Sequence, residues 1–351
     1  MGKTALITGI AGQDGRYLAE YLLGLDYRIV GLIHTQRPDR QEALQREIPQ
    51  LEFERGDLTD GNSLISVMNR VKPDEIYNLG ALSFVGSSWD EAEKYANVTG
   101  VGVLRILSAI RQVVPEARFY QASSSEMFGL VQETPQTERT PFHPRSPYGV
   151  AKMTGHWYVV NFRESYDTFA CSGILFNHES PRRGTEFVTR KISRAAARIR
   201  YGLQNEVELG NLASRRDWGF AGDYVRAMHL MLQQGQPDDY VVATGETHSV
   251  REFAELAFQA AGVPIHWQVE TANPGDTRPE GLRTTGVRDD NGETVVRVSP
   301  KFFRPAEVDL LKGDSAKARR VLGWEPQVSF PELVAMMVEH DLKEQRDQIK
   351  D

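Results

Sequence analysis

The chain is short of the features that would place it in a membrane or an oxidising compartment. Cys171 is the only cysteine among 351 residues, which excludes an intramolecular disulfide bond. The N-terminal stretch MGKTALITG carries an apolar run that Thr8 and Gly9 interrupt. Such a run is too short for a signal-peptide core or a membrane span. We therefore expect a cytoplasmic protein that does not associate with membranes.

A large excess of charge of one sign is also lacking. The 48 acidic and 41 basic residues leave a net charge of −7, which argues against a nucleic-acid partner while leaving room for a local anion pocket. The histidines, His178 among them, show no spacing typical of metal ligands, so we predict no metal site. A hydrophobic content of 40% suits one large or two modest globular domains.

What the first half does contain is an alternation of short apolar runs and helix-like stretches. We expect strands at Thr4–Thr8, Arg28–Ile33, Leu51–Phe53, Glu75–Leu79, Ala117–Ala122, Ala170–Leu175 and Tyr240–Thr244. Gly15–Leu25 and Val101–Val113 are typical of the helices between them. Alternating strands and helices imply parallel strands joined by right-handed crossovers. The prediction is a Rossmann-like, doubly wound α/β fold.

The second half is richer in loops, with Arg, Asp, Asn and Pro between fewer regular elements. We expect helices at Val188–Tyr201, Ala221–Gln234, Val250–Ala261 and Pro331–Lys350. The stretch Thr271–Glu293 is predicted to be a mobile loop before a strand at Thr294–Val298. Residues 1–176, with the returning strand near 240–244, are therefore assigned to a Rossmann domain. Residues 177–239 and 245–351 are assigned mainly to a smaller, interleaved domain.

Three glycines after the first strand indicate a dinucleotide. Gly9, Gly12 and Gly15 let the backbone turn tightly and approach a pyrophosphate, whose charge a helix N-terminus favours. Two later strand ends fit the same ligand. Asp57, before Leu58, could accept a hydrogen bond from an adenine amino group, and the small residues of Asn78–Ala81 would let a cofactor lie close. Ordinary turns would explain either strand end alone.

The end of the second strand bears on the choice of cofactor. An acid there would bind the ribose hydroxyls of NAD, whereas an arginine would accommodate the 2′-phosphate of NADP. The segment His34–Arg37 contains no acid, and Arg37 and Arg40 follow the strand. NADP(H) is favoured and NAD(H) stays open.

Tyr148 and Lys152 stand four residues apart, which places them on one face of a helix. An ammonium beside a phenol favours the ionised phenol, making tyrosine a usable base toward an alcohol. Ser124 would supply a second hydroxyl to the same substrate oxygen. Glu126 is surplus to alcohol oxidation. It is either a solvated acid or helix cap, or a base that removes a proton made acidic by a neighbouring ketone.

Six segments in this order resemble the extended short-chain dehydrogenases and, more narrowly, the GDP-mannose 4,6-dehydratase family. They are GIAGQDGRYL, ASSSEMFG, TPFHPRSPYGVAK, LFNHESPRRG, RRDWGFAGDYV and FRPAEVDLLKGD. The resemblance runs from Thr4 to about Met337. It implies an NADP-binding Rossmann domain, a sugar-nucleotide-binding domain and a homodimer or homotetramer.

The resemblance also implies the chemistry. Tyr148, with Lys152 and Ser124, would assist hydride removal from sugar carbon 4. Glu126 would take the carbon 5 proton while the carbon 6 hydroxyl leaves as water. Return of the hydride to carbon 6 would yield GDP-4-keto-6-deoxy-D-mannose.

Binding residues follow from the matching motifs. Those assigned to the cofactor are Gly9, Gly12, Gln13, Asp14, Gly15, Arg37, Asp57, Leu58, Leu79, Ala81, Tyr148 and Lys152. Those assigned to the GDP-sugar are Ser83, Asn177, Glu179, Arg182, Val188, Lys191, Arg216, Arg304 and Glu307. Lys191, Arg216 and Arg304 offer charged donors to a diphosphate, and Glu307 could accept from the guanine ring.

The chain departs from the family pattern at a few positions. Ser124 stands where threonine is frequent, Thr35-Gln36 replaces an arginine pair, and Leu82 replaces a glutamine. Leu82 keeps open a dehydratase or epimerase acting on a related GDP-sugar, such as a heptose or octose. A catalytically silent NADP-binding regulator is the alternative from another class, and the intact catalytic set argues against it.

Overall fold

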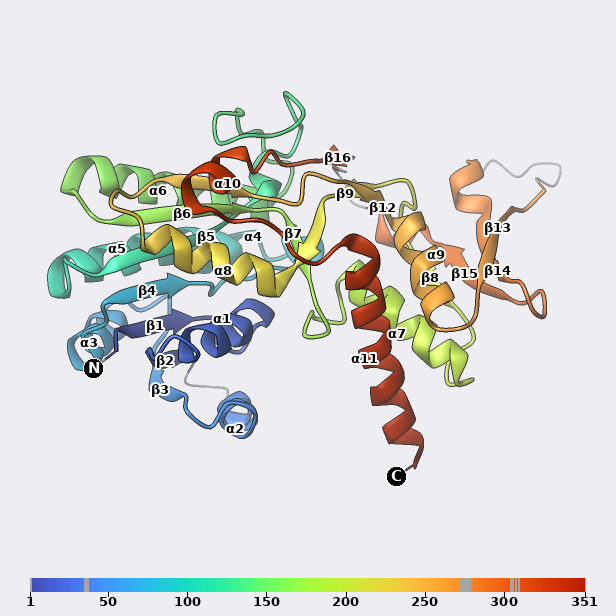
Figure 1. Cartoon of the computed structure of the whole chain (residues 1–351). Coiled ribbons are helices and arrows are strands. Elements are labelled where there is room, and N and C mark those ends of the chain that lie inside the picture. The colour runs from blue at the N-terminus through green and yellow to red at the C-terminus, as the bar shows by residue number, and fades with distance from the viewer. Residues whose placement is uncertain are drawn as a thin grey trace. The chain divides into compact units, whose positions relative to one another are not determined.

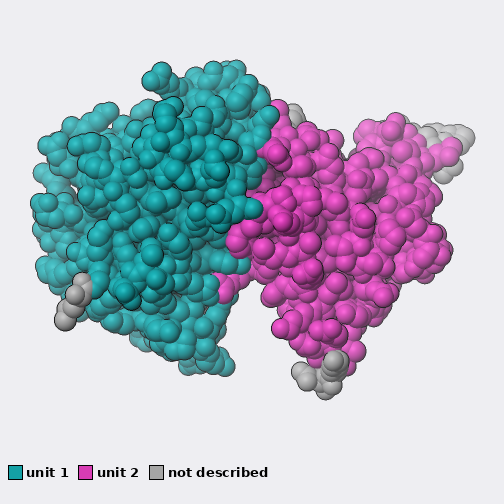
Figure 2. Space-filling view, in the orientation of Figure 1, with its two compact units in different colours: residues 1–178, 221–245, 312–327 teal, residues 179–220, 246–311, 328–351 magenta. Residues whose placement is uncertain are grey.

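The computed structural model describes residues 2–34, 38–271, 279–303, 306, 308 and 310–350, and of residues 38–40 and 350 only the backbone. The chain divides into two compact units, coloured separately in Figure 2. Unit 1 comprises Met1–His178, Ala221–Gly245 and Lys312–Gln327, and unit 2 comprises Glu179–Phe220, Glu246–Leu311 and Val328–Asp351. Each unit is thus assembled from three separate stretches of chain.

A seven-stranded parallel sheet forms the centre of unit 1 (Figure 1). Its strands are β1 (Thr4–Thr8), β2 (Arg28–Ile33), β3 (Glu52–Arg55), β4 (Glu75–Asn78), β5 (Arg118–Ser124), β6 (Ala170–Leu175) and β11 (Asp239–Val242). The order β11-β6-β5-β4-β1-β2-β3 reverses direction between β1 and β4, where Rossmann-like folds bind ligands at the strands' carboxyl ends. The predicted fold class is confirmed, and strand ends differ from expectation by at most two residues.

Helices cover both faces of this sheet. On one face α1 (Gln13–Leu23) and α8 (Ala221–Leu232) pack with α10 (Ala316–Leu322), burying Leu18, Met228 and Trp324. On the other face α3 (Gly61–Val71), α5 (Gly102–Val113) and α6 (Pro147–Tyr166) form a second core. The other unit 1 elements are α2 (Pro38–Glu47), η1 (Val85–Ser87), α4 (Ala92–Tyr95), the π-helical η2 (Ala96–Val101) and η3 (Ser125–Met127). Cores on both faces explain why the strands read as continuous apolar runs.

Unit 2 has its own apolar core. Its helices α7 (Val188–Arg200), α9 (Val250–Ala260) and α11 (Phe330–Lys350) bury Ile192, Phe253 and Leu333. Its strands are β8 (Val207–Leu209), β9 (Arg215–Arg216), β10 (Trp218–Phe220), β12 (His248–Ser249), β13 (Ile265–Val269), β14 (Thr284–Arg288), β15 (Thr294–Val298) and β16 (Leu310–Leu311). Two 3₁₀ turns, η4 (Glu280–Arg283) and η5 (Pro300–Phe302), lie among them, and β7 (Asn177–Glu179) spans the position where the first stretch of unit 1 ends.

One expectation about unit 2 is wrong. The predicted mobile loop Thr271–Glu293 contains η4 and the buried strand β14, while residues 272–278 lie outside the described part of the chain. β14 pairs antiparallel with β13 on one side and β15 on the other. Its polar, glycine-containing sequence is stabilised by these partners, so the local pattern did not reveal it.

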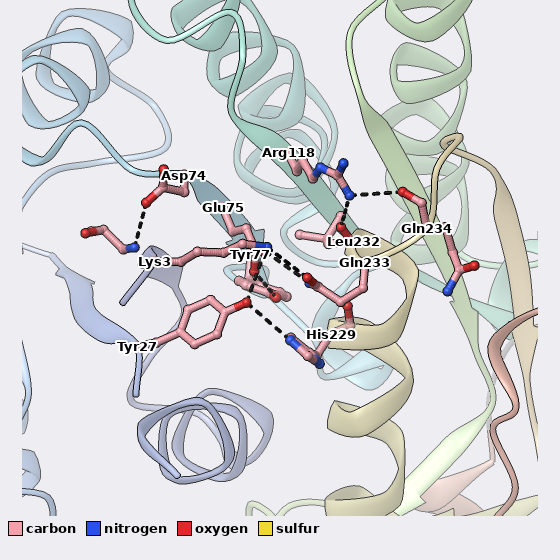
Figure 3. Close-up of polar contacts among 11 residues, drawn as sticks. Lys3, Tyr27, Asp74, Glu75, Tyr77, Arg118, His229, Leu232, Gln233 and Gln234 are labelled. Atoms are coloured by element: carbon pink, nitrogen blue, oxygen red, sulfur yellow. Dashed lines mark hydrogen bonds and ion pairs between the residues drawn. The ribbon is translucent and has the colours of Figure 1, made fainter. Parts of the chain in front are cut away.

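At the amino ends of the strands, a buried carboxylate joins several elements of unit 1 (Figure 3). Glu75 accepts hydrogen bonds from Lys3 at 2.8 Å, Tyr77 at 2.7 Å, Gln233 at 3.0 Å and Tyr27 at 3.2 Å. Its side chain is 1% exposed. Burial would raise the pKa of Glu75, but the bonds from Lys3, Gln233 and Tyr77 hold it below the usual value.

Replacing Glu75 with Gln should therefore destabilise the fold. Because a neutral amide cannot satisfy all the buried donors, we expect a loss of about 2 kcal/mol in unfolding free energy at pH 7. Urea unfolding measures it. The matched control is Glu52→Gln, which breaks an ion pair with Arg28 whose side chains are half-exposed and should change stability by at most roughly 0.5 kcal/mol.

The difference in stability between the parent and Glu75→Gln should also depend on pH. The folded-state pKa of Glu75 lies below 4.5, so its contribution is complete above that pH and is lost as pH falls through the folded value. The stability gap between the parent and Glu75→Gln should narrow below about pH 4.5. A gap that widens on acidification would contradict this account.

Candidate active site

The segment ASSSEMFG forms a strand end followed by an anchored turn. β5 ends at Ser124 and η3 carries Glu126, while Met127 and Phe128 are completely buried. The ring of Phe128 contacts Phe176, with centroids 6.0 Å apart. The backbone after the turn is held by two hydrogen bonds to His143, at 2.9 and 3.1 Å. The bulky apolar residues after the acid therefore fix its position.

Ser124 and Glu126 lie together in this turn. Ser124 Oγ accepts the backbone N–H of Glu126 at 3.2 Å, so the serine is the cap. Glu126 is only 7% exposed, which excludes the alternative of a solvated surface acid. A buried carboxylate at a strand's carboxyl end is placed where ligands bind in doubly wound sheets.

Tyr148 and Lys152 are brought to the same place by α6. Ser146 caps this helix by accepting the N–H of Gly149 at 3.0 Å, and Pro147 occupies its first turn. Tyr148 and Lys152 are both buried, and the Lys152 ammonium lies 5.8 Å from the Tyr148 ring centroid. A Cβ on Gly149 would come within 2.7 Å of the Glu126 carbonyl oxygen. Glycine thus lets the helix start pack directly on the turn that holds Glu126.

Lys152 is an almost fully buried amine. Among the described residues the structure gives its ammonium one hydrogen bond, to the Ala122 carbonyl at 2.7 Å. Burial lowers the pKa of Lys152 to about 8, against an opposing effect of Asp14. The lysine is therefore charged at neutral pH, with donors left for a ligand.

The glycine loop is shaped for close backbone approach. Gly9 has φ +70°, and a Cβ there would lie 2.7 Å from the backbone of Leu79 and Gly80. A Cβ on Gly15 would meet the Gly9 carbonyl at 2.6 Å. Gly12 is the N-cap residue of α1 and makes no side-chain cap, and in the described part of the chain a Cβ there would meet only the Gly9 carbonyl within 4 Å. The first turn of α1 therefore presents backbone amides suited to a pyrophosphate.

His178 is a residue that sequence reasoning considered only as a metal ligand and set aside. Its Nε2 lies 2.9 Å from Asp14 and its Nδ1 lies 2.8 Å from the Phe176 carbonyl. Gln13 donates to its backbone carbonyl at 3.0 Å, and Tyr224 stacks on its ring at 4.6 Å. His178 thus holds Gln13 and Asp14 of the glycine loop against the end of β6. The detectable signal was its place just after a strand, in the LFNHESPRRG segment.

The other predicted cofactor residues lie at neighbouring strand ends. Asp57 accepts two bonds from Thr59 and faces His34 at 3.1 Å. Burial opposes these contacts, but together they hold the pKa of Asp57 below its usual value. Leu58 and Leu79 are partly buried against the two cores, and Ala81 is half-buried. Arg37 lies outside the described residues.

Two predicted substrate residues belong to unit 1. Ser83 is exposed after β4. Asn177 is half-buried after β6, and its buried Oδ1 has no hydrogen-bond partner in the described part of the chain. Such an acceptor is suited to a ligand donor.

Unit 2 carries the other seven, of which the structure describes five. Glu179 is buried, accepting from Thr189 at 2.6 Å and pairing with Arg183 at 3.1 Å, and the Arg182 amide bonds Ser180. Val188 starts α7. Arg216 is buried and donates to the Arg215 carbonyl. Arg304 and Glu307 lie outside the described residues.

Lys191 is a partly buried cation of unit 2. Its ammonium lies 3.4 Å from the centroid of the Phe302 ring. Burial, assisted by Lys301 and opposed by Glu208, lowers the pKa of Lys191 to about 8. The charged form of a partly desolvated cation is stabilised when an anion binds next to it.

One group of metal-ligand types occurs among the described residues, namely His340, Asp341 and Glu344. Its buried carboxylate, Asp341, pairs with Arg190 and accepts from Ser193 at 2.7 Å. A guanidinium therefore already fills the place of a cation. None of the described helices combines the length and the apolar character that crossing a bilayer requires.

Solved structures place the fold in a class. The chain superposes on RMD from Pseudomonas aeruginosa complexed with NADPH, with a TM-score of 0.74 and 21% identity over 97% of this chain and 99% of that one. UDP-glucose 4-epimerase from Thermotoga maritima gives 0.78 and 22% over 97% and 99%. dTDP-glucose 4,6-dehydratase from Bacillus anthracis gives 0.77 and 18% over 98% of each chain. The fold is that of the nucleotide-sugar epimerases and dehydratases.

Sequence comparison narrows the class to a family. The model of the GDP-mannose 4,6 dehydratase family matches residues 6–337. The relatives named GDP-mannose 4,6 dehydratase are 52% identical in Drosophila melanogaster, over 97% of this chain and 86% of that protein, and 50% in Homo sapiens, over 98% and 93%. The Vibrio cholerae relative is 49% identical over 98% and 95%. The chain belongs to the GDP-mannose 4,6-dehydratase family, which confirms the predicted resemblance.

Gly149→Ala tests the packing that assembles the catalytic residues. The added methyl group must push α6 away from the Glu126 turn, so we expect turnover to fall about 10- to 100-fold with a stability loss of about 1–3 kcal/mol. Steady-state kinetics and urea unfolding measure the two effects. Gly61→Ala, where a Cβ would meet none of the described residues within 4 Å, is the matched control and should retain parental turnover. Parental turnover in Gly149→Ala would count against this close packing.

Proposed function

We infer that this chain is a hydro-lyase that converts GDP-mannose to GDP-4-keto-6-deoxy-D-mannose. The observation that carries the inference is the burial of Glu126, which follows Ser124 on a turn packed against the start of α6, the helix that carries Tyr148 and Lys152. A tyrosine, a lysine and a serine suffice for alcohol oxidation, whereas elimination needs a further base. Membership of the GDP-mannose 4,6-dehydratase family supports the same reaction.

The roles of the residues follow from their positions. Tyr148 takes the proton of the carbon 4 hydroxyl, Ser124 holds that oxygen, and the Lys152 ammonium supplies positive charge next to the phenol. A bound NADP supplies the hydride acceptor at carbon 4 and the donor at carbon 6. Glu126 takes the carbon 5 proton, which the adjacent ketone has acidified, as the carbon 6 hydroxyl departs. The protons leaving oxygen 4 and carbon 5 match those needed to form water and to reprotonate carbon 5.

The cofactor is NADP(H), with NAD(H) as the alternative. Gly9, Gly12, Gln13, Asp14 and Gly15 are proposed to hold its pyrophosphate, and Asp57 its adenine. The open approach to Gly12 and the unused donors of Lys152 fit such a ligand. Arg37 and Arg40 support NADP, since arginine accommodates a 2′-phosphate. Identification of the dinucleotide that copurifies with the protein decides between the two.

The GDP-sugar is assigned to Ser83, Asn177, Glu179, Arg182, Val188, Lys191, Arg216, Arg304 and Glu307. The low pKa of Lys191 supports its part in binding phosphate, because burial makes its charge costly until an anion arrives. We accordingly assign cofactor binding to residues 1–176 with the strand near 240–244, and substrate binding mainly to 177–239 and 245–351.

Glu126→Gln tests the assignment of the base. The variant should lose product formation about 10²- to 10⁴-fold, since an amide cannot take the carbon 5 proton. Oxidation at carbon 4 should persist and appear as NADPH absorbance. Glu91→Gln removes an exposed acid and should be indistinguishable from the parent. Normal product formation by Glu126→Gln would remove Glu126 from the mechanism.

Incubation with GDP-mannose tests the substrate. Mass spectrometry should find a product lighter than the substrate by one water. An unchanged mass would instead favour a related GDP-sugar, heptose or octose, as Leu82 allows; Leu82 packs against the apolar cluster that contains Tyr148.

We further propose that the protein is a cytoplasmic homodimer or homotetramer, because most soluble oligomers are symmetric homo-oligomers. Sedimentation equilibrium distinguishes these two states from a monomer.

A further inference from the structure

A chain of buried amide and hydroxyl groups crosses the centre of the parallel sheet. Thr8 Oγ1 on β1 donates to Asn78 Oδ1 on β4 at 2.6 Å, and Asn78 Nδ2 donates to Gln121 Oε1 on β5 at 2.7 Å. Each of the three side chains is 2% exposed. Polar groups buried to this degree are seldom retained among apolar strands unless they are fully hydrogen-bonded.

The hydrogen bonds of this network can run in only one direction. Gln121 Nε2 donates to the Ala122 carbonyl at 2.9 Å, a group that can only accept, so Gln121 Oε1 is turned toward Asn78. Asn78 must then present its amide nitrogen to Gln121 and its amide oxygen to Thr8, which leaves the Thr8 hydroxyl as the donor. Thr8 Oγ1 also accepts the backbone N–H of Gly80 at 2.9 Å. Flipping the amide of Asn78, of Gln121 or of both would set two oxygen atoms against each other, so these hydrogen bonds allow no flip.

This series of hydrogen bonds ends at the Ala122 carbonyl, which also accepts a hydrogen bond from Lys152. Ala122 O accepts from Lys152 Nζ at 2.7 Å as well as from Gln121, and a carbonyl has two lone pairs for two donors. Gln121 restrains this acceptor without adding charge beside the lysine. Asp14 of α1 favours the charged form of Lys152, and the ring centroid of Tyr148 on α6 lies 5.8 Å from the ammonium.

We propose that Gln121 is a positioning residue for the dehydratase reaction: its amide holds the Ala122 carbonyl that orients Lys152, and Asn78 and Thr8 hold that amide in place from the other side. The proposal rests on the proposed function for its kinetic consequence only. The coupling between Gln121 and Lys152 is a property of unit 1 itself.

Two substitutions at Gln121 separate positioning from simple support of the fold. Gln121→Glu replaces the amide donor with a carboxylate close to the lysine, which favours the ammonium and should raise the midpoint of Lys152 titration by about one pH unit or more. Gln121→Met keeps the volume but removes the donor. It should lower kcat about 10-fold or more while leaving KM for GDP-mannose within about twofold, since the substrate contacts are untouched.

The measurements are NMR titration of ¹³C-lysine-labelled protein without substrate, with Lys152→Arg to assign the signal, and the pH dependence of kcat.

Thr8→Val and Thr8→Ser serve as a matched pair should Gln121→Met fail to fold. Valine has the shape of threonine without the hydroxyl and should lower kcat in the same way, whereas serine restores the donor and should recover most of it. Parental Lys152 titration in Gln121→Glu, together with parental kcat in Thr8→Val, overturns the proposal. If the parent does not turn over GDP-mannose, the proposed function fails, and the titration still decides whether Gln121 acts on Lys152.

Discussion

The burial of a single amine, Lys152, is the constraint around which the site is arranged. An ammonium removed from water is unstable unless oriented dipoles or charges offset the loss of solvent. Here the Ala122 carbonyl contacts it directly and Asp14 acts on it through space. Ala122 belongs to the end of β5 and Asp14 to the start of α1. Stabilising the ammonium of Lys152 therefore links the proposed cofactor loop to α6, the helix that carries this lysine. The remaining desolvation leaves the lysine charged at neutral pH yet close to its titration range.

In the proposed reaction Glu126 is the base that distinguishes a dehydratase from an alcohol dehydrogenase, and its position depends on apolar packing. Met127 and Phe128 are buried completely, and Gly149 allows α6 to lie against the carbonyl of the turn. A loosely held acid would be solvated and poorly directed, whereas this one is 7% exposed. The chemistry therefore rests on the residues after the acid as much as on the carboxylate itself.

The two edges of the sheet use buried polar groups differently. At the amino edge, Glu75 gathers the donors Lys3, Tyr27, Tyr77 and Gln233 into a network that stabilises the fold (Figure 3). Toward the carboxyl edge, the chain from Thr8 to Gln121 carries no net charge and ends at the lysine's acceptor. The charge of Glu75 is satisfied by its buried donors, whereas a charge placed in the second network would shift the pKa of Lys152, the proposed partner of Tyr148.

The amino-acid sequence by itself determined the features that depend on neighbouring residues. Strands buried on both faces read as apolar runs, so β1, β2 and β6 were predicted at their observed ends. The four-residue spacing of Tyr148 and Lys152 likewise specified one helix face. Tertiary structure decided what depends on distant partners. β14 exists because β13 and β15 pair with it, and the burial of Glu126 depends on a helix twenty residues downstream. Thr8 and Asn78 lie 70 residues apart and Asn78 and Gln121 lie 43 apart, and a hydrogen bond across such a separation leaves no periodic trace in the chain.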